Sequence, residues 1–252
     1  CDNSPYHSAI HTLRPHVDHQ LVAKDILRLR AGSDIENMAK FSVQDPYSFR
    51  CIPQVHGASY DAMMYIKNII ETELNGVTDN PNIFPDEDLI LSGGNFHAQP
   101  LALVLDHLTL SLAELANISE RRTYQLINGD RGLPAYLAAN PGINSGYMIL
   151  QYTTAALASE NKGLCFPSSA DSIPTSLGQE DHVSMGSIGG RKALRVLENI
   201  EKILAIELLT AAQAFEFRKP MKSGVILDEI HGTLRKQVSF AEKDRVFADD
   251  IE

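Results

Sequence analysis

Long proline-free stretches of this chain carry apolar residues at helical spacing, and this pattern limits the folds that the chain can adopt. The longest stretch covers residues 191–217, where apolar side chains recur every three or four residues. Helix interiors strongly exclude proline, and the 12 prolines of the chain fall outside this stretch. Apolar residues cover its second half on nearly all sides. This indicates a helix that is buried in a bundle core or in a subunit interface.

Three more stretches, 55–74, 101–127 and 147–164, share this periodicity. Strand signals are scarce, because only residues 82–84 and 89–91, joined by a Pro-Asp-Glu-Asp turn, have the pattern of a small hairpin. No internal repeat or low-complexity linker divides the chain. The sequence therefore predicts an all-α fold: a single helical region over residues 1–252, built as a bundle of long helices with at most one small β-hairpin and with functional loops at its ends.

Charge and composition disfavour several classes of partner. The formal net charge is −10, whereas a nucleic-acid surface needs a basic face, so we expect no nucleic-acid partner. No apolar run reaches the ~18 residues of a membrane span, so we expect no membrane partner. Cys1, Cys51 and Cys165 are widely spaced, as is typical of reduced thiols in a cytoplasmic protein. A first residue that is cysteine, within a polar stretch, indicates a fragment or a processed product.

The segment 44–51 brings an amide, a phenol and a guanidinium together around a proline. The planar guanidinium of Arg50 can donate two parallel hydrogen bonds to a carboxylate. Tyr47 adds a phenolic proton, and Gln44 adds an amide. These residue types favour a site that holds an amino-acid carboxylate beside a proton-transfer group. A turn at Asp45-Pro46, with Tyr47 and Arg50 packing at a helix end, is the alternative reading.

Two later loops also combine polar groups with glycine or aromatic residues. Residues 92–97 join adjacent glycines to an amide, Phe96 and an imidazole, and glycine lets a backbone approach a ligand closely. A tight turn after the hairpin is the alternative. Residues 178–185 place Gln179, Glu180, Asp181 and His182 before the longest helix. Helix capping explains Asp181 equally well, but it does not require all four polar groups.

Histidines are frequent near the start of the chain, and their spacing raises the question of a metal site. His7 and His11 are four residues apart, which can place two imidazoles on one helical face. However, Pro15 interrupts the run and no cysteine joins it. We therefore expect no metal site, and solvated or capping histidines instead.

The chain resembles the aromatic amino-acid lyase family, and within it the branch of histidine ammonia-lyases. The matching motifs occur in the order of the family and cover most of the chain; they lie at 44–51, 78–81, 92–97, 119–122, 144–146, 158–162 and 179–185. The resemblance implies the helical fold of the family and the elimination of ammonia from L-histidine to give urocanate, a step of histidine degradation. It also implies a cytoplasmic homotetramer whose active sites draw residues from several subunits.

The resemblance assigns roles to particular residues of the substrate site. It implies that Arg50 binds the substrate carboxylate, that Tyr47 takes part in proton transfer, and that Gln44 donates or accepts a hydrogen bond in the same pocket. It further implies that Phe96 packs against an electrophilic methylidene-imidazolone ring, which the family makes from its own Ala-Ser-Gly backbone. These 252 residues contain no Ala-Ser-Gly triplet.

Substrate choice depends on the second loop. The resemblance implies that Glu180, aided by Gln179, meets the imidazole of the substrate. A carboxylate can pair with an imidazole N–H but finds no partner on a phenyl ring, so its burial would disfavour phenylalanine. The motif therefore favours histidine as the substrate.

The missing triplet indicates that the chain is the C-terminal half of a larger enzyme and is inactive by itself, with a complementary N-terminal segment as a partner. Two alternatives remain at this point. A tyrosine or phenylalanine ammonia-lyase or aminomutase of the same family would retain the fold and most motifs, and a non-catalytic helical assembly protein would use the same bundle without chemistry.

Overall fold

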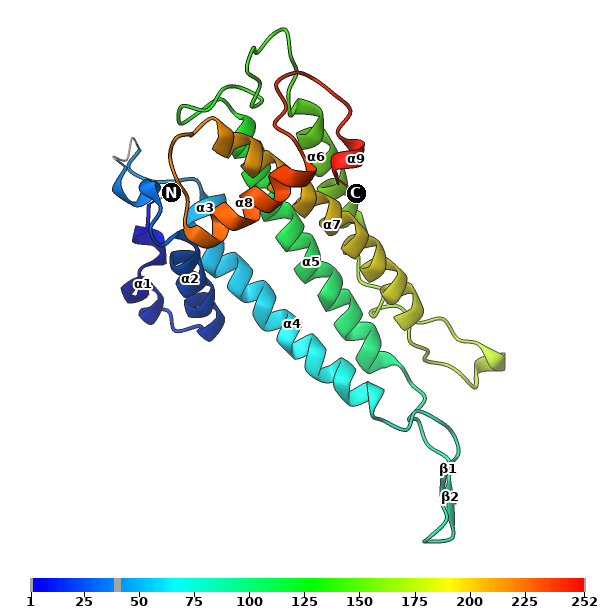
Figure 1. The fold of residues 1–252 in the computed structure, drawn as a ribbon. Helices are drawn as coiled ribbons and strands as arrows, with labels where there is room; N and C mark the ends of the chain where they lie inside the picture. The colour runs from blue at the N-terminus through cyan, green and yellow to red at the C-terminus, as the bar shows by residue number, and fades with distance from the viewer. Residues whose placement is uncertain (1, 39–41, 252) are drawn as a thin grey trace.

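Four long helices form an elongated bundle (Figure 1). The computed structural model describes residues 2–38 and 42–251. Helix α5 (Gln99–Ile127) packs against α4 (Ile52–Leu74), α6 (Met148–Leu164) and α7 (Gly186–Glu216), and its contact with α7 is the most extensive. Each of these helices contains one of the stretches with apolar periodicity, within a few residues at either end. The predicted all-α fold is thus confirmed.

The core of the bundle lies where α5, α6 and α7 meet, and it falls into two clusters. The first lies midway along these helices and consists of Leu112, Ala116, Val196, Ile200 and Ile203. The second cluster lies where the end of α5, the start of α6 and the end of α7 meet the loop after α5 and the C-terminal segment. It consists of Ile127, Leu137, Tyr147, Leu150, Ile206, Leu209, Ala214, Val238 and Ala241. Burial of these side chains provides the main driving force for packing the helices.

Helix α7 is not buried on all sides within one chain. Its second half buries Ile203, Ile206 and Leu209. A row of leucines on another face stays exposed; it consists of Leu194, Leu197, Leu204 and Leu208. The sequence predicted that this helix is buried in a bundle core or in a subunit interface. The core of a single chain therefore covers only part of its apolar surface.

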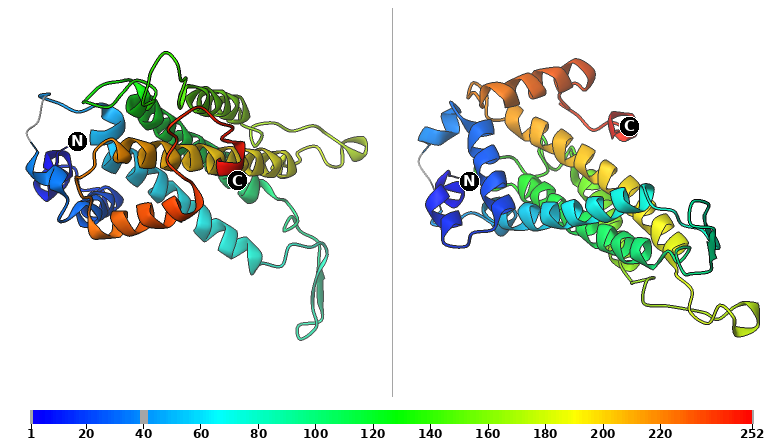
Figure 2. Two further views of the ribbon diagram at one scale, coloured as in Figure 1. Left: turned by 45° about the horizontal axis from the view of Figure 1, so that its top comes forward. Right: turned by 90° about the horizontal axis from the view of Figure 1, so that it is seen from below.

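The predicted hairpin is confirmed and projects from one end of the bundle (Figure 1). Strand β1 (Asn82–Phe84) pairs antiparallel with β2 (Leu89–Leu91), with Ile83 opposite Ile90. Its isoleucines are well exposed. The hairpin and the loop that precedes α7, which contains the short 3₁₀ helix η3 (Ser176–Gly178), extend from the same end of the bundle (Figure 1 and Figure 2).

The opposite end of the bundle carries the N-terminal elements. These are η1 (Ser4–Tyr6), α1 (Ser8–Thr12), α2 (Val17–Arg30), η2 (Asp34–Asn37) and α3 (Tyr47–Arg50). Helix α2 crosses α4 at Gly57, where an added Cβ would lie 2.8 Å from the backbone nitrogen of His19. Only a glycine at this position permits such a close crossing.

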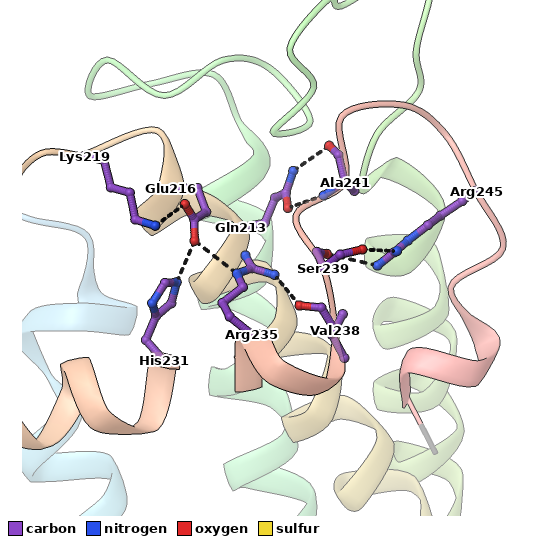
Figure 3. A network of polar contacts seen from close by, with 9 residues as sticks. All are labelled: Gln213, Glu216, Lys219, His231, Arg235, Val238, Ser239, Ala241 and Arg245. Atoms are coloured by element: carbon purple, nitrogen blue, oxygen red, sulfur yellow. Dashed lines mark hydrogen bonds and ion pairs between the residues drawn. The ribbon is translucent and has the colours of Figure 1, made fainter. Parts of the chain in front are cut away.

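Helix α8 (Val225–Gln237) folds back across α7, as Figure 3 shows from close by. The carboxylate of Glu216 lies 2.6 Å from Lys219 Nζ, 3.0 Å from His231 Nε2 and 3.1 Å from Arg235 Nε. Burial alone would raise the pKa of Glu216, but Lys219, Arg235 and His231 lower it below its usual value. The side chain of Gln213 then exchanges two hydrogen bonds with the backbone of Ala241, which holds the segment before α9 (Ala248–Ile251).

Within the described ranges, α5 is the helix whose length and apolar composition would suffice to cross a membrane. It nevertheless buries Asp106, Glu120 and Arg122 against protein partners and packs against three other long helices. These contacts make it the core helix of the bundle. Cys51 and Cys165 carry free thiols, while Cys1 lies outside the described residues.

Candidate functional site

The segment 44–51 folds as an extended approach to the short helix α3. Pro46 precedes the helix, and the backbone N–H of Cys51 donates to the carbonyl of Tyr47 at 2.9 Å, which closes its single turn. The ring of Tyr47 is 71% exposed. The Arg50 guanidinium lies over this ring, with Cζ 4.5 Å from the ring centroid, in the geometry of a cation–π contact. The structure therefore places the phenol and the guanidinium of the predicted site side by side.

Arg50 retains an unused hydrogen-bond donor. Its Nε is buried, and among the described residues no group accepts a hydrogen bond from it. Arg50 and Gln44 line a hollow of about 390 Å³, together with Gln54 and residues of the N-terminal segment. Because Arg50 lines the hollow, a carboxylate that entered it would meet the guanidinium.

The N-terminal segment holds helix α3 in place. The buried hydroxyl of Tyr6 donates to the carbonyl of Phe49 at 2.7 Å. Burial raises the pKa of Tyr6, so its hydroxyl keeps the proton that it donates. This bond ties η1 to α3 and restricts the orientation of Arg50.

A buried polar cluster joins three helices close to α3. Arg122 of α5 pairs through Nε and Nη2 with the carboxylate of Glu207 of α7, and its Nη1 lies 3.0 Å from His56 Nε2 of α4. Ser119 donates to the same carboxylate at 2.6 Å. Residues 119–122 form one of the motifs that match the family, but the sequence did not predict that His56 of α4 and Glu207 of α7 would contact Arg122. The available sequence signal is the run of charged residues Glu120, Arg121 and Arg122 within a long helical stretch.

This cluster makes stability depend on pH. Burial, with Arg122 nearby, lowers the pKa of His56 from 6.5 to about 4. The unfolded chain binds this proton more readily than the folded one, so the stabilisation is complete above pH 6.5 and is lost as the pH falls toward 4. We expect a loss of up to about 3 kcal/mol across this range. Unfolding measurements from pH 7 to 5, where most carboxylates stay ionised, will show a flatter dependence for His56→Gln than for the wild type; equal slopes would exclude His56 as the source.

The second group of predicted residues lies at the other end of the bundle. Phe96 is 57% exposed in the loop before α5, and no described aromatic ring packs against it. Asn80 holds this loop by accepting from Ser92 Oγ at 3.0 Å and from the Gly93 N–H at 2.9 Å. An added Cβ at Gly93 would meet no atom within 4 Å, so this part of the loop is open.

Glu180 and Gln179 lie exposed in the loop before α7. The backbone of Thr175 donates to the carbonyl of Glu180 at 3.0 Å, and the hydroxyl of Thr175 contacts its carboxylate. Asp181 does not cap α7, because the helix begins at Gly186 with Met185 as its N-cap. The capping alternative for Asp181 is therefore wrong, since the loop continues for several residues before the helix starts.

One chain does not bring the two groups together. Tyr47 and Arg50 precede α4, whereas Phe96 and Glu180 lie beyond its far end (Figure 1). Helix α4 has 23 residues, which at a rise of ~1.5 Å per residue corresponds to roughly 35 Å. A single site that used both groups would need them from different copies of the chain.

The N-terminal histidines serve local structure. Nδ1 of His7 accepts from the Ala9 N–H at 3.2 Å, and His11 Nε2 lies 3.0 Å from the carbonyl of Pro5. The rings of His16 and His19 contact each other in a tilted arrangement, with their centroids 4.4 Å apart. Across residues 2–38 and 42–251, no three metal-ligating side chains gather in a metal-binding arrangement.

Comparison with known proteins gives a consistent result. The family model described as aromatic amino acid lyase matches residues 1–236. Histidine ammonia-lyase of Natranaerobius thermophilus is 52% identical over 98% of this chain and 49% of its own length; that of Alkaliphilus metalliredigens is 50% identical over 96% and 48%. The chain thus spans about half the length of these curated relatives.

Solved structures agree with these sequence matches. The crystal structure of histidine ammonia-lyase from Trypanosoma cruzi superimposes with a TM-score of 0.92 at 46% identity, over 99% of this chain and 47% of that one. Phenylalanine aminomutase of Pantoea agglomerans superimposes with a TM-score of 0.93 at 30% identity, over 99% and 53%. The family match, the identities and the shared fold lead to one conclusion: the chain belongs to the aromatic amino acid lyase family.

Proposed function

We propose that this chain is the C-terminal half of a histidine ammonia-lyase, and that it supplies two parts of a substrate site. The observation that carries the proposal is the chemistry at the two ends of the bundle. One end holds Arg50 beside Tyr47, with a buried donor that has no acceptor among the described residues, and the other holds the exposed Phe96 and Glu180 on adjoining loops. Identities of about 50% to histidine ammonia-lyases, against 30% to a phenylalanine aminomutase, support histidine as the substrate.

In the proposed reaction, a C–H bond and the C–N bond of histidine break, a carbon–carbon double bond forms, and ammonia leaves to give urocanate. Arg50 binds the carboxylate through its guanidinium and so fixes the substrate backbone. Tyr47, stacked on Arg50, holds or accepts a proton next to the bound amino acid. Gln44 completes this half of the site from the wall of the same hollow.

Glu180 selects the side chain in this proposal. Its carboxylate accepts a hydrogen bond from the substrate imidazole, with Gln179 beside it. The hydroxyl of Thr175 contacts the same carboxylate, and this contact orients it. A phenyl ring offers no such donor, so phenylalanine would leave the carboxylate without its partner.

The family's methylidene-imidazolone group would have to come from residues outside this chain, because no Ala-Ser-Gly triplet is present. The described residues fit such a planar group, since the ring of Phe96 is exposed and unstacked at the Glu180 end. When bound, the group supplies the electrophile that activates the substrate. The 252 residues alone would then be inactive.

We further propose that the site forms between copies of the chain in a homotetramer. Tyr47 and Arg50 lie too far from Phe96 and Glu180 to serve one substrate within a single copy. The exposed leucine row on α7 provides an apolar surface for assembly; it consists of Leu194, Leu197, Leu204 and Leu208. Exposed apolar rows of this length usually mark an interface.

Substitution of Glu180 by glutamine tests the substrate assignment. In the full-length protein we expect kcat/KM for histidine to fall about tenfold to a hundredfold, because a neutral amide replaces a charge-assisted acceptor. Glu229→Gln on the exposed face of α8 is the matched control and will leave turnover unchanged. Steady-state kinetics with histidine, phenylalanine and tyrosine will decide. Intact histidine kinetics would refute the imidazole contact, and faster turnover of tyrosine or phenylalanine by the wild type would favour a related lyase or aminomutase.

A further inference from the structure

A histidine, His97, joins the loop that carries Phe96 to the loop that carries Glu180. His97 Nε2 lies 3.0 Å from the backbone carbonyl of His182. The two imidazole rings stack with their centroids 5.4 Å apart and an interplanar angle of 26°. His97 directly follows Phe96, and His182 lies two residues after Glu180. The contact therefore spans the two loops next to both proposed site residues.

The hydrogen bonds of His97 fix its tautomer. Nδ1 accepts from the backbone N–H of Gln99 at 3.3 Å, so in the neutral ring the proton sits on Nε2. Nε2–H then donates to the carbonyl of His182. The ring is thus held by its own backbone on one side and joins the neighbouring loop through the other.

The Glu180 loop is held separately at its start. Asp106 accepts from the Ser169 N–H at 2.7 Å, and Gln99 Nε2 donates to the Ser169 carbonyl at 2.9 Å. Lys192 contacts Phe166 and donates to Ser168 Oγ at 2.9 Å. The returning arm, which carries Glu180, is tied to the outgoing arm of the same loop by the Val183 N–H, which donates to Ser172 Oγ at 2.9 Å, and by the Thr175 N–H, which donates to the Glu180 carbonyl at 3.0 Å. The bond from His97 reaches that arm from the Phe96 loop.

We propose that His97 is a positioning residue that sets the place of the Glu180 carboxylate relative to Phe96. The inference deepens the proposed function, on which its kinetic part rests. Nε2–H of His97 faces two acceptors on His182, the backbone carbonyl at 3.0 Å and the ring Nδ1 at 3.3 Å, and the shorter of the two contacts is the one to the loop backbone. A displacement of about 1 Å at a substrate contact can lower the rate substantially, so a single interloop bond is sufficient to matter.

Two conservative variants in the full-length protein separate the bond that His97 Nε2 donates to His182 from the bond that Nδ1 accepts from Gln99. Glutamine can place its amide nitrogen near the position of Nε2 and retain the bond to His182, whereas asparagine can reproduce only the Nδ1 acceptor for Gln99. We expect His97→Gln to stay close to the wild type and His97→Asn to lower kcat/KM for histidine about tenfold. His7→Asn is the matched control, because His7 caps the Ala9 N–H in the same way without an interloop bond.

A double-mutant cycle tests whether His97 acts through Glu180. If it does, His97→Asn will have little further effect when Glu180→Gln is already present. Additive losses would overturn the proposal, and so would equal losses in the asparagine and glutamine variants. Either result would indicate a general structural role for the ring.

Amide hydrogen exchange of the same proteins gives a readout that does not need turnover. We expect residues 172–183 to exchange faster in His97→Asn than in the wild type or His97→Gln. Unchanged exchange in His97→Asn would overturn the interloop link whatever the kinetics show. If the wild type does not convert histidine, the proposed function fails, and the exchange comparison alone decides whether His97 joins the loops.

Discussion

Replacing Arg50 with alanine in the full-length protein is expected to lower kcat/KM for histidine about a hundredfold to a thousandfold. The guanidinium is positioned over the ring of Tyr47, and its buried Nε has no acceptor within residues 2–38 and 42–251. Its removal would cost two charge-assisted hydrogen bonds to the substrate. The measurement is steady-state turnover of histidine over a wide range of concentrations.

Two further variants make the test of Arg50 specific. Arg50→Lys keeps the charge but loses the planar pair of donors, so its kcat/KM should fall between those of wild type and Arg50→Ala. Arg28→Ala removes an arginine from an exposed ion pair with Asp25 on α2 and should leave kinetics unchanged. If Arg50→Ala turned over histidine like the wild type, Arg50 would not bind the substrate carboxylate.

The long helices and the hairpin were predictable because each has a strong local signal. Helices α5 and α7 carry a wide apolar stripe over many turns, and the hairpin is marked by two short apolar runs around a turn. Helices α2 and α8 give weaker signals, because the apolar stripe of α2 is poorly defined and that of α8, although clear at Ile226, Leu227, Ile230 and Leu234, covers only 13 residues. In α2 only His19 and Ala23 are buried, and α8 has no buried residue, so the contacts that hold these two helices are made with residues far away in the sequence.

The site was predictable as residue types but not as an arrangement. Segment 44–51 and the two later loops were recognisable because amides, carboxylates and rings are concentrated in short stretches. The helix between them, α4, follows from the periodicity of residues 55–74, but the placement of both later loops together at its far end is a property of the folded bundle. The same holds for His56 and Glu207, which meet Arg122 across 66 and 85 residues of sequence.

The pair between Arg122 and Glu207 leads to the largest expected effect on stability. The side chains of Arg122 and Glu207 are only 9% and 18% exposed, and Glu207 also accepts from Ser119. Glu207→Ala would leave the Arg122 cation buried without its carboxylate, with the neutral His56 as a poor substitute. We expect a loss of about 3–5 kcal/mol in the free energy of unfolding, measured by urea denaturation of the full-length protein at one fixed concentration.

Two comparisons distinguish an unpaired charge from the simple loss of contacts. Glu198→Ala on the same helix removes an exposed carboxylate that pairs with Arg195 at 3.4 Å, so it should cost less than about 1 kcal/mol. Replacing Arg122 with methionine and Glu207 with leucine together removes both charges while filling similar volume. This double variant should be more stable than Glu207→Ala, because no buried charge is left without a partner. A double variant as unstable as Glu207→Ala would instead mean that the cluster stabilises the fold through its shape and its bonds to Ser119 and His56.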